Sequence, residues 1–238
     1  DLHSFPTRRS SDLHIGLKEY DPAQASKVYA ADGRLITDLG LERRTVIPLK
    51  DISPAVVQAF LATEDKRFYE HSGIDWVRVL GAAKGAVFGR LTGASTITMQ
   101  LAGNLFPEDI NRRDRSLKRK LREMKVALDI EQRYPKDRIL ELYLNQIDLG
   151  NRAFGVEAAA QRYFGKSSRD LNVAEAATLA AIPKGPSMFN PRRNPARNVL
   201  RRNVVLNLLR DQHLLTEAET ERWKAYMEIG RASCRERV

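Results

Sequence analysis

Cysteine, histidine and long apolar runs are scarce in this chain, and each scarcity excludes a class of protein. Cys234 is the single cysteine in 238 residues, so no disulfide can form within the chain. The four histidines have no cysteine partners and form no His-x-x-x-His pair, which argues against a structural zinc site. No run of about 18 apolar residues occurs, so the sequence predicts no membrane-spanning helix.

Acidic residues are fewer than basic ones, with 30 Asp and Glu against 40 Lys and Arg, which gives a net charge of +10. Such an excess favours an anionic partner, and nucleic acid, phosphorylated substrates and acidic lipid surfaces all satisfy it. The hydrophobic content of 42% and the charged content of 29% are typical of a globular protein. The length suffices for one sizeable domain or two small ones.

The two ends of the chain differ from the rest. Residues 1–17 show neither helical nor strand periodicity and lack the apolar centre of a signal peptide. We interpret 1–17 and 229–238 as non-native tails, translated from sequencing-adapter read-through, and expect the natural protein to continue at both ends. Residues 18–50 are expected to be extended, with a short β-hairpin that turns at Asp32-Gly33. From residue 51 to 228 the pattern is helical, and it predicts a mostly α domain.

The first predicted helix starts at Ser53-Pro54, where a capping hydroxyl precedes a proline at the first helical position. Helical spacing places four residues on one stripe of it: Val57, Leu61, Glu64 and Phe68. A carboxyl group in partly apolar surroundings keeps its proton more readily than one in water, which suits a general base near neutral pH. The alternative is a Glu64 at a helix end, bonded to backbone or to Arg67.

The next predicted helix covers residues 74–88, with Trp76, Leu80 and Val87 as expected core residues. Glycines at 81, 85, 89 and 93 make this segment easy to bend. With Val87, Phe88 and Leu91 nearby, the segment either dips into a membrane interface or forms an exposed loop over a core helix.

A basic helix is predicted from about Arg112 to Tyr134. Its apolar residues follow at spacings of 4, 3 and 4 and are expected to form its buried stripe: Leu117, Leu121, Met124 and Leu128. On another flank, Arg115, Arg119 and Glu123 are four residues apart. The ordinary explanation is a surface salt bridge. The functional one is a phosphate-binding face formed by Arg115, Arg119 and Lys120.

Further helices are predicted over residues 136–145, 172–182, 197–213 and 216–227. The first has a continuous apolar face: Ile139, Leu140, Tyr143, Leu144 and Ile147. The helices over 172–182 and 216–227 begin with capping boxes, Asn172 with Glu175 and Thr216 with Glu219. Gly165 is placed as a C-cap.

Several of these segments match a known family in sequence order. Glu-Asp-x-x-Phe-x-x-His-x-Gly at 64–73 resembles the first motif of the family-51 peptidoglycan glycosyltransferases of class A penicillin-binding proteins and monofunctional transglycosylases. Gly-x-Ser-Thr-Ile-Thr-x-Gln-Leu at 93–101 resembles the second, and Arg119-Lys120-x-x-Glu123 the third. Residues 136–145 and 155–166 resemble the fourth and fifth.

This resemblance implies a lysozyme-like glycosyltransferase fold with a small membrane-facing lobe, over residues 51–228. It implies polymerisation of lipid II into β-1,4-linked glycan strands, with inversion and release of undecaprenyl pyrophosphate, at the extracytoplasmic face of the cytoplasmic membrane. Glu64 and Glu123 would be the catalytic carboxylates, and a divalent cation, Mg or Mn, could assist at Glu123. Substrate binding would fall to Asp65, Phe68, His71, Ser95, Thr96, Gln100, Asn104, Arg115, Arg119 and Lys120.

The expected partners are lipid II, the growing glycan strand, a membrane surface and, in the intact protein, a transpeptidase domain. The chain itself has no Ser-x-x-Lys, Ser-x-Asn or Lys-Thr-Gly, so penicillin binding is not expected of it. No nucleic-acid reader motif is present, which argues against a nucleic-acid partner.

Two alternatives remain open. A muramidase-like hydrolase would use Glu64 as a general acid but would have no pyrophosphate for the basic helix to bind. A catalytically impaired relative is suggested by Gly103, where many family members have a basic residue implicated in binding pyrophosphate.

Overall fold

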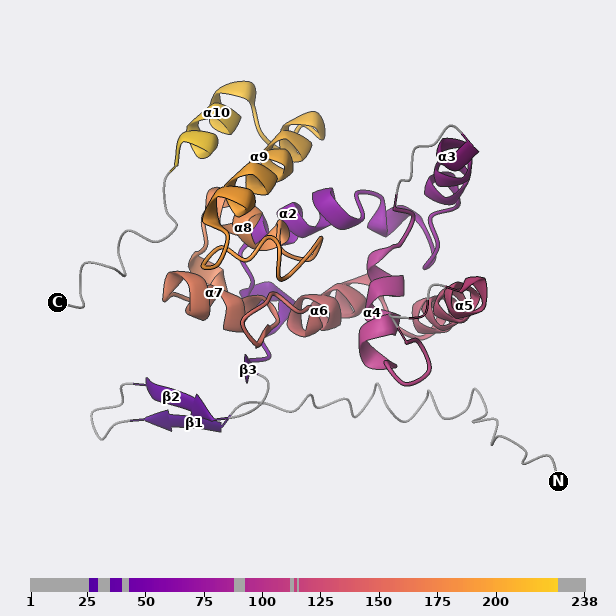
Figure 1. Ribbon diagram of the computed structural model, residues 1–238, viewed down its shortest axis with the longest axis horizontal. Helices are drawn as coiled ribbons and strands as arrows, with labels where there is room; N and C mark the ends of the chain where they lie inside the picture. Colours follow the sequence, from indigo (N-terminus) through magenta and orange to yellow (C-terminus); the bar gives the residue numbers. More distant parts are fainter. Residues whose placement is uncertain are drawn as a thin grey trace.

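The computed structural model (Figure 1) describes residues 26–29, 35–39, 43–87, 93–111, 114 and 116–226. Both tails and the Asp32-Gly33 turn lie outside these residues, as do Arg115 and the 88–92 part of the glycine-rich segment. Within the described residues, no helix is both long enough and apolar enough to cross a bilayer.

The structure is mostly helical, as the sequence predicts. The helices are α2 (Pro54–Glu64), α3 (Trp76–Val87), α4 (Ile97–Leu105), α5 (Leu117–Arg133), α6 (Lys136–Gln146), α7 (Val156–Phe164), α8 (Val173–Ala180), α9 (Pro195–Asp211) and α10 (Glu217–Ala225). One-turn 3-10 helices cover Leu49–Asp51, Phe68–Glu70 and Ser168–Asp170.

Strands contribute little. β1 (Ser26–Tyr29) pairs antiparallel with β2 (Leu35–Leu39), while β3 (Arg43–Arg44) pairs parallel with β4 (Ala153–Phe154). The connection from β1 to β2 is not described, so the hairpin turn stays a prediction. The β3–β4 pairing fastens the chain that leads into α2 beside the start of α7.

Local sequence signals fix the helix ends. Ser53 caps α2 by accepting from Ala55 N, and Thr96 caps α4 by accepting from Met99 N. Both expected capping boxes form, at the start of α8 and of α10, and the expected C-cap of α7, Gly165, is left-handed with φ +71°. Each of these devices satisfies backbone groups that a helix leaves unpaired.

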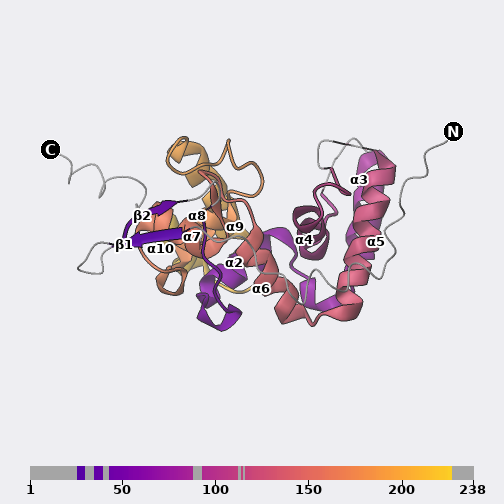
Figure 2. The ribbon, with the colours of Figure 1, turned by 90° about the horizontal axis from the view of Figure 1, so that it is seen from below.

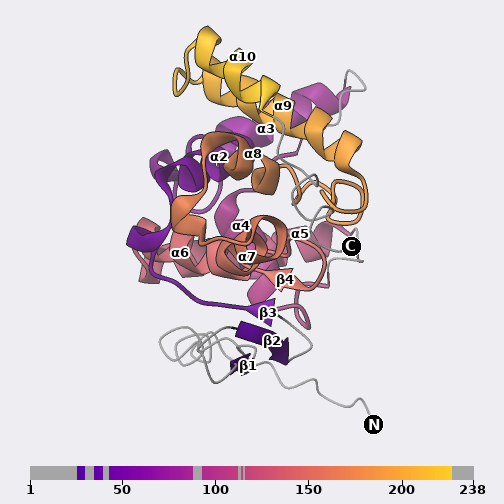
Figure 3. The same ribbon diagram turned by 90° about the vertical axis from the view of Figure 1, so that its left-hand side faces the viewer.

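Two packed groups of helices make up the core (Figures 1 and 3). In one, α2 packs against α8 and α9, and α8 is almost entirely buried because its alanines allow close approach. In the other, α4 packs between α5 and α6. The predicted apolar face of α6 is confirmed, since Ile139, Leu140 and Leu144 are fully buried.

The predicted packing of α3 and α5 is wrong. Trp76 and Leu80 on α3 are 58% and 69% exposed, and the side chain of Val87 is not described. On α5, Leu117 and Leu121 are 84% and 65% exposed.

The buried residues of α5 are Glu123, Ala127 and Ile130 instead. They follow at i, i+4 and i+7, so a helical stripe is buried, but it is a different stripe from the one with the leucines. Figure 2 shows α3 and α5 together at one end of the molecule, away from the α2–α8–α9 group. The leucine face of α5 is apolar, as the spacing predicts, but it is exposed and does not pack into the core.

Candidate active site

Glu64 is the last residue of α2 and is half-buried. Its Oε2 accepts a hydrogen bond of 2.8 Å from Nε2 of Gln100, on the first turn of α4. The helix ends at Glu64, and Phe68 lies beyond it in a one-turn 3-10 helix, so the four-residue stripe is not one continuous helix. The Glu64 side chain nevertheless binds a neighbouring helix, while Arg67 pairs with Asp75.

Asp65 and His71 form a buried pair next to Glu64. His71 Nε2 lies 3.0 Å from Asp65 Oδ2, and its Nδ1 accepts from Gly73 N, so the hydrogen-bond network assigns the proton to Nε2. Asp65 Oδ2 also accepts from Ile97 N at 3.0 Å. One carboxylate therefore ties the first motif to the start of α4.

The first amides of α4 are consequently occupied. Ile97 N binds Asp65, and Met99 N binds the hydroxyl of Thr96, which itself donates to Gly73 O at 2.6 Å. These two amides at the helix start therefore serve internal hydrogen bonds. Phe68, Asp65 and Thr96 are all buried, and in this arrangement they shape the loop around Glu64.

Glu123 is the second carboxylate, 6% exposed on the inner side of α5. Its Oε2 accepts from Arg119 Nη1 at 2.8 Å and from Lys120 Nζ at 2.9 Å. Lys120 Nζ also donates to Ser95 Oγ at 2.9 Å. An exposed surface salt bridge, the ordinary explanation for this spacing, does not describe a buried acid whose lysine partner also binds a second segment.

The short segment 95–100 connects the two carboxylates. Its last residue, Gln100, binds Glu64, and its first, Ser95, binds the lysine that pairs with Glu123. Cations accompany Glu123, whereas Glu64 has a neutral amide partner. The two acids are thus linked through one segment and have opposite electrostatic surroundings, an arrangement that gives paired carboxyls different roles.

Arg78 on α3 is a residue that sequence reasoning missed. Its Nη1 donates to Glu64 O at 2.7 Å, its Nη2 donates to Gly93 O at 3.2 Å, and Nη1 lies 3.6 Å from Asp65 Oδ1. Arg78 therefore binds two backbone carbonyls of the site, those of Glu64 and Gly93. Only the apolar positions of this helix were considered from the sequence. The available signal was Asp75, directly before the helix, whose Oδ1 accepts from Arg78 N.

Asp75 is fully buried and ionised in this setting. Burial alone would raise its pKa, but hydrogen bonds from the Arg67 side chain and from Arg78 N outweigh that effect and hold the pKa below its usual value of 3.8. The loop that follows Glu64 is thereby fixed by a buried ion pair.

Behind the site, Glu131 of α5 joins two other helices. Thr98 Oγ1 of α4 donates to it at 2.5 Å, and Lys136 Nζ of α6 at 2.8 Å. Lys136 also lies 4.3 Å from the centre of the Phe68 ring. These contacts hold α4, α5 and α6 in a fixed arrangement around the carboxylates.

For Arg115, Asn104 and Gly103 the structure gives little information about a role in the site. Arg115 lies outside the described residues. Asn104 is half-buried one residue before α4 ends, and Gly103 is buried beside it. Among the described residues, neither position forms a hydrogen bond or an ion pair with Glu64 or Glu123.

The divalent cation expected at Glu123 stays a prediction. Within the described part of the chain, no group of three His, Cys, Asp or Glu residues could hold one. Oε2 of Glu123 already accepts from Arg119 and Lys120, and hard divalent ions need several oxygen ligands. We therefore assign no step to a metal.

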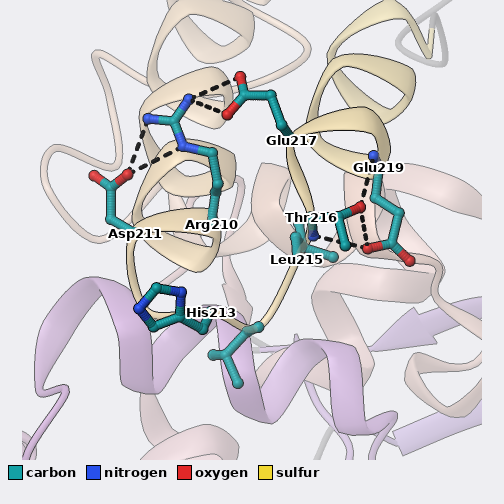
Figure 4. Close-up of a pocket in the computed structure, with 8 residues that line it drawn as sticks. Arg210, Asp211, His213, Leu215, Thr216, Glu217 and Glu219 are labelled. Carbon is teal, nitrogen blue, oxygen red and sulfur yellow. Dashed lines mark hydrogen bonds and ion pairs between the residues drawn. The ribbon is translucent and has the colours of Figure 1, made fainter.

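The pocket of Figure 4 is a separate feature, at the turn from α9 to α10. It measures about 520 Å³ and contains none of the motif residues. Its charged groups are already paired: Arg210 binds Asp211 and Glu217, and Glu219 completes the capping box of α10. We interpret it as a structural turn.

A helical domain with one half-buried acid and a second acid held by cations offers the pair of carboxyl groups that enzymes acting on glycosidic bonds commonly use. Comparison with known proteins gives the family. A family model described as Transglycosylase matches residues 32–210. The chain belongs to this transglycosylase family.

Its relatives include penicillin-binding proteins 1A. The one from Escherichia coli (strain K12) is 49% identical over 195 residues, which cover 81% of this chain and 22% of the relative. The one from Aquifex aeolicus is 46% identical over 207 residues, 86% of this chain and 28% of the relative. A crystal structure of penicillin-binding protein 1A from Haemophilus influenzae matches with a TM-score of 0.51 at 29% identity, over 88% of this chain and 21% of that one. The chain thus spans about a quarter of the length of these relatives.

Proposed function

We propose that this chain polymerises lipid II into β-1,4-linked glycan strands, and that Glu64 and Glu123 act together in that reaction. The observation that carries the proposal is the segment 95–100, which contacts one carboxylate directly and the other through Lys120. The transglycosylase family and the order of its motifs support the same reaction.

Glu64 is assigned the role of general base. The acceptor sugar hydroxyl is a poor nucleophile until it loses its proton, and a half-buried carboxylate can take it. Gln100 holds Glu64 Oε2 and leaves the other carboxylate oxygen for the hydroxyl. Attack on the anomeric carbon of the growing strand through an oxocarbenium-like state inverts its configuration.

Arg119 and Lys120 are assigned to the leaving group. Undecaprenyl pyrophosphate departs with added negative charge, and two cations already ordered by Glu123 stabilise that charge without moving. Glu123 positions these donors, and Ser95 fixes Lys120 from the opposite side. Arg115, His71 and Asn104 keep their proposed substrate-binding roles as hypotheses, together with the glycosyltransferase boundaries 51–228.

The exposed apolar faces of α3 and α5 are proposed to contact the membrane. Six large apolar side chains are exposed on these two helices: Trp76, Val77, Leu80, Leu117, Leu121 and Leu128. A soluble monomer rarely exposes such a group of residues, and a lipid-linked substrate requires its enzyme to approach the bilayer. We propose that α3 and α5 form the membrane-facing lobe of a lysozyme-like fold, and that the reaction takes place at the extracytoplasmic membrane surface.

The much greater length of the relatives supports a further domain in the intact protein. Because those relatives are named penicillin-binding proteins and this chain lacks the penicillin-binding motifs, we propose that the further domain is a transpeptidase.

The experiment that tests the reaction compares two substrates. Incubated with lipid II, the chain should lengthen glycan, and incubated with finished glycan, it should leave the strands intact. Shortened strands would instead identify a muramidase-like hydrolase. Failure on both substrates, reversed when Gly103 is replaced by Lys or Arg, would identify the impaired relative.

A further inference from the structure

A second polar pocket lies between two connections, the one from α6 to α7 and the one from α8 to α9. It measures about 490 Å³, and its polar lining includes Asp148, Arg152, Ser187, Asn190 and Arg193. None of these residues belongs to the site described above. In Figure 1 the 184–194 segment runs between α9 and α6, in front of the helices that hold the core.

Arg152 occupies a backbone conformation that its side chain disfavours. Asn151 and Arg152 have φ values of +52° and +61°, and Ala153 N donates to Gly150 O at 2.9 Å to close the turn. Positive φ at both central positions is the pattern of a type I′ hairpin turn, in which the second central residue is usually glycine. An arginine here is strained, and strain of this kind persists where the side chain is needed.

Within the part of the chain that the structure describes, the two guanidiniums of the pocket are unpaired. Among the described residues, neither the Arg152 side chain nor the Arg193 side chain forms a hydrogen bond or an ion pair. Asp148 lines the same pocket, but its Oδ1 accepts from Gly150 N at 2.8 Å, and among the described residues it forms no ion pair with either arginine. Arg192, adjacent in sequence and outside the pocket, donates to Arg162 O.

The surroundings add positive charge. No acidic residue occurs between Glu175 and Asp211, whereas that stretch contains many basic ones: Lys184, Arg192, Arg193, Arg197, Arg201, Arg202 and Arg210. Only Arg202 of these is buried. Asp148 is the one acidic residue of the pocket lining against two arginines, so the formal charge of the pocket is positive, and a concave surface of one net sign concentrates ligands of the opposite sign.

We propose that this pocket binds a carboxylate on the peptide stem of the glycan substrate, through Arg152 and Arg193. Guanidinium forks match a carboxylate in geometry, and binding a part of the substrate remote from the reacting bond contributes energy to the reaction. A peptide carboxylate is favoured over a phosphate because the proposed reaction already places the pyrophosphate beside Arg119 and Lys120. The identity of the ligand rests on the proposed function; the anion site does not.

A direct binding measurement tests the site without any turnover. The full chain is titrated with soluble muramyl pentapeptide, with the same peptide as its C-terminal amide, and with inorganic phosphate, by calorimetry or NMR. The free carboxylate should bind about tenfold more tightly than the amide, as expected when charge-assisted hydrogen bonds are lost. Equal binding of peptide and amide, or tighter binding of phosphate, would overturn the proposal.

Three variants assign the effect to residues. Arg152→Gly and Arg193→Gln should each weaken peptide binding by about tenfold. Arg192→Gln, the matched control, should leave it within about twofold. Arg152→Gly should also raise Tm by about 1–3 °C, because glycine adopts positive φ without strain. A lowered Tm, or unchanged peptide binding in both pocket variants, would contradict the inference.

A kinetic measurement separates this proposal from the proposed function. With amidated lipid II, the wild-type chain should show a raised KM that Arg152→Gly does not raise further. If the chain polymerises lipid II but ignores amidation, the pocket proposal fails alone. If it polymerises nothing yet binds the free peptide more tightly than the amide, the proposed function fails alone.

Discussion

The exposed leucines of α5 yield a prediction about two quantities, the stability of the fold and the affinity for a membrane. We consider the double variant Leu117→Ser/Leu121→Ser. Complete burial of a leucine contributes about 1.5–3 kcal/mol. Because Leu117 and Leu121 are 84% and 65% exposed, the folded chain gains only a small part of that from them. Scaled by buried fraction, the variant should lose about 1 kcal/mol of unfolding free energy. Leu144→Ala, at a fully buried position, should lose about 2–5 kcal/mol.

Membrane binding should respond in the opposite order. If both leucines enter the interface, their removal costs about 3 kcal/mol of partitioning free energy, or about a hundredfold in affinity. The assay is flotation with anionic vesicles at low salt, and denaturant unfolding is measured on the same samples. Leu200→Ser is the matched control, since Leu200 is 70% exposed on α9, a helix of the other packed group. That control should change neither quantity appreciably.

Two results would refute this reasoning. If the double variant floats with vesicles as the wild type does, α5 does not contact the membrane. If it loses as much stability as Leu144→Ala, these leucines are core residues, as their spacing alone had predicted.

Three further predictions follow from individual contacts. Gly155→Ala should lower the unfolding free energy by more than about 2 kcal/mol, because φ is +82° and a Cβ would lie 2.7 Å from Asn145 O; thermal unfolding measures this, and an unchanged Tm would contradict it. Burial alone would raise the pKa of Glu157, but hydrogen bonds from the 167–168 turn and Gln161 hold it below 4.5. The ionised Glu157 should therefore stabilise the fold above pH 4.5, and this contribution should be lost as the pH falls through the folded-state pKa. Glu157→Gln should flatten the dependence of unfolding free energy on pH in that range. Lys120→Met should slow lipid II polymerisation by about tenfold or more, whereas Lys118→Met, on the exposed side of α5, should not; equal rates for the two variants would remove Lys120 from the site.

Features determined by a few neighbouring residues could be predicted from the sequence. The caps of α8 and α10 and the left-handed Gly165 depend on side chains within three or four positions, and the structure has all of them. The buried face of α6 was also predicted correctly, because helical period alone identifies its stripe.

Features that depend on the packing partner could not be predicted. An apolar stripe shows that a face avoids water, but it does not distinguish a protein core from a lipid surface, and so the leucines of α5 and Trp76 were misplaced. Long-range side-chain bonds are equally invisible to spacing: nothing local indicates that Gln100 binds Glu64 or that Arg78 spans the backbone beside it. The family motifs supplied the identities of the two carboxylates, and only the fold showed the segment that links them.

The most direct test of this account measures lipid II polymerisation by Glu64→Gln, Glu123→Gln and the double variant, with circular dichroism to establish that helix content is unchanged. If both carboxylates serve one reaction, each single variant should lose nearly all activity, and the double variant should lose little more than the worse of the two. Polymerisation by a folded Glu64→Gln chain at the wild-type rate would contradict the account.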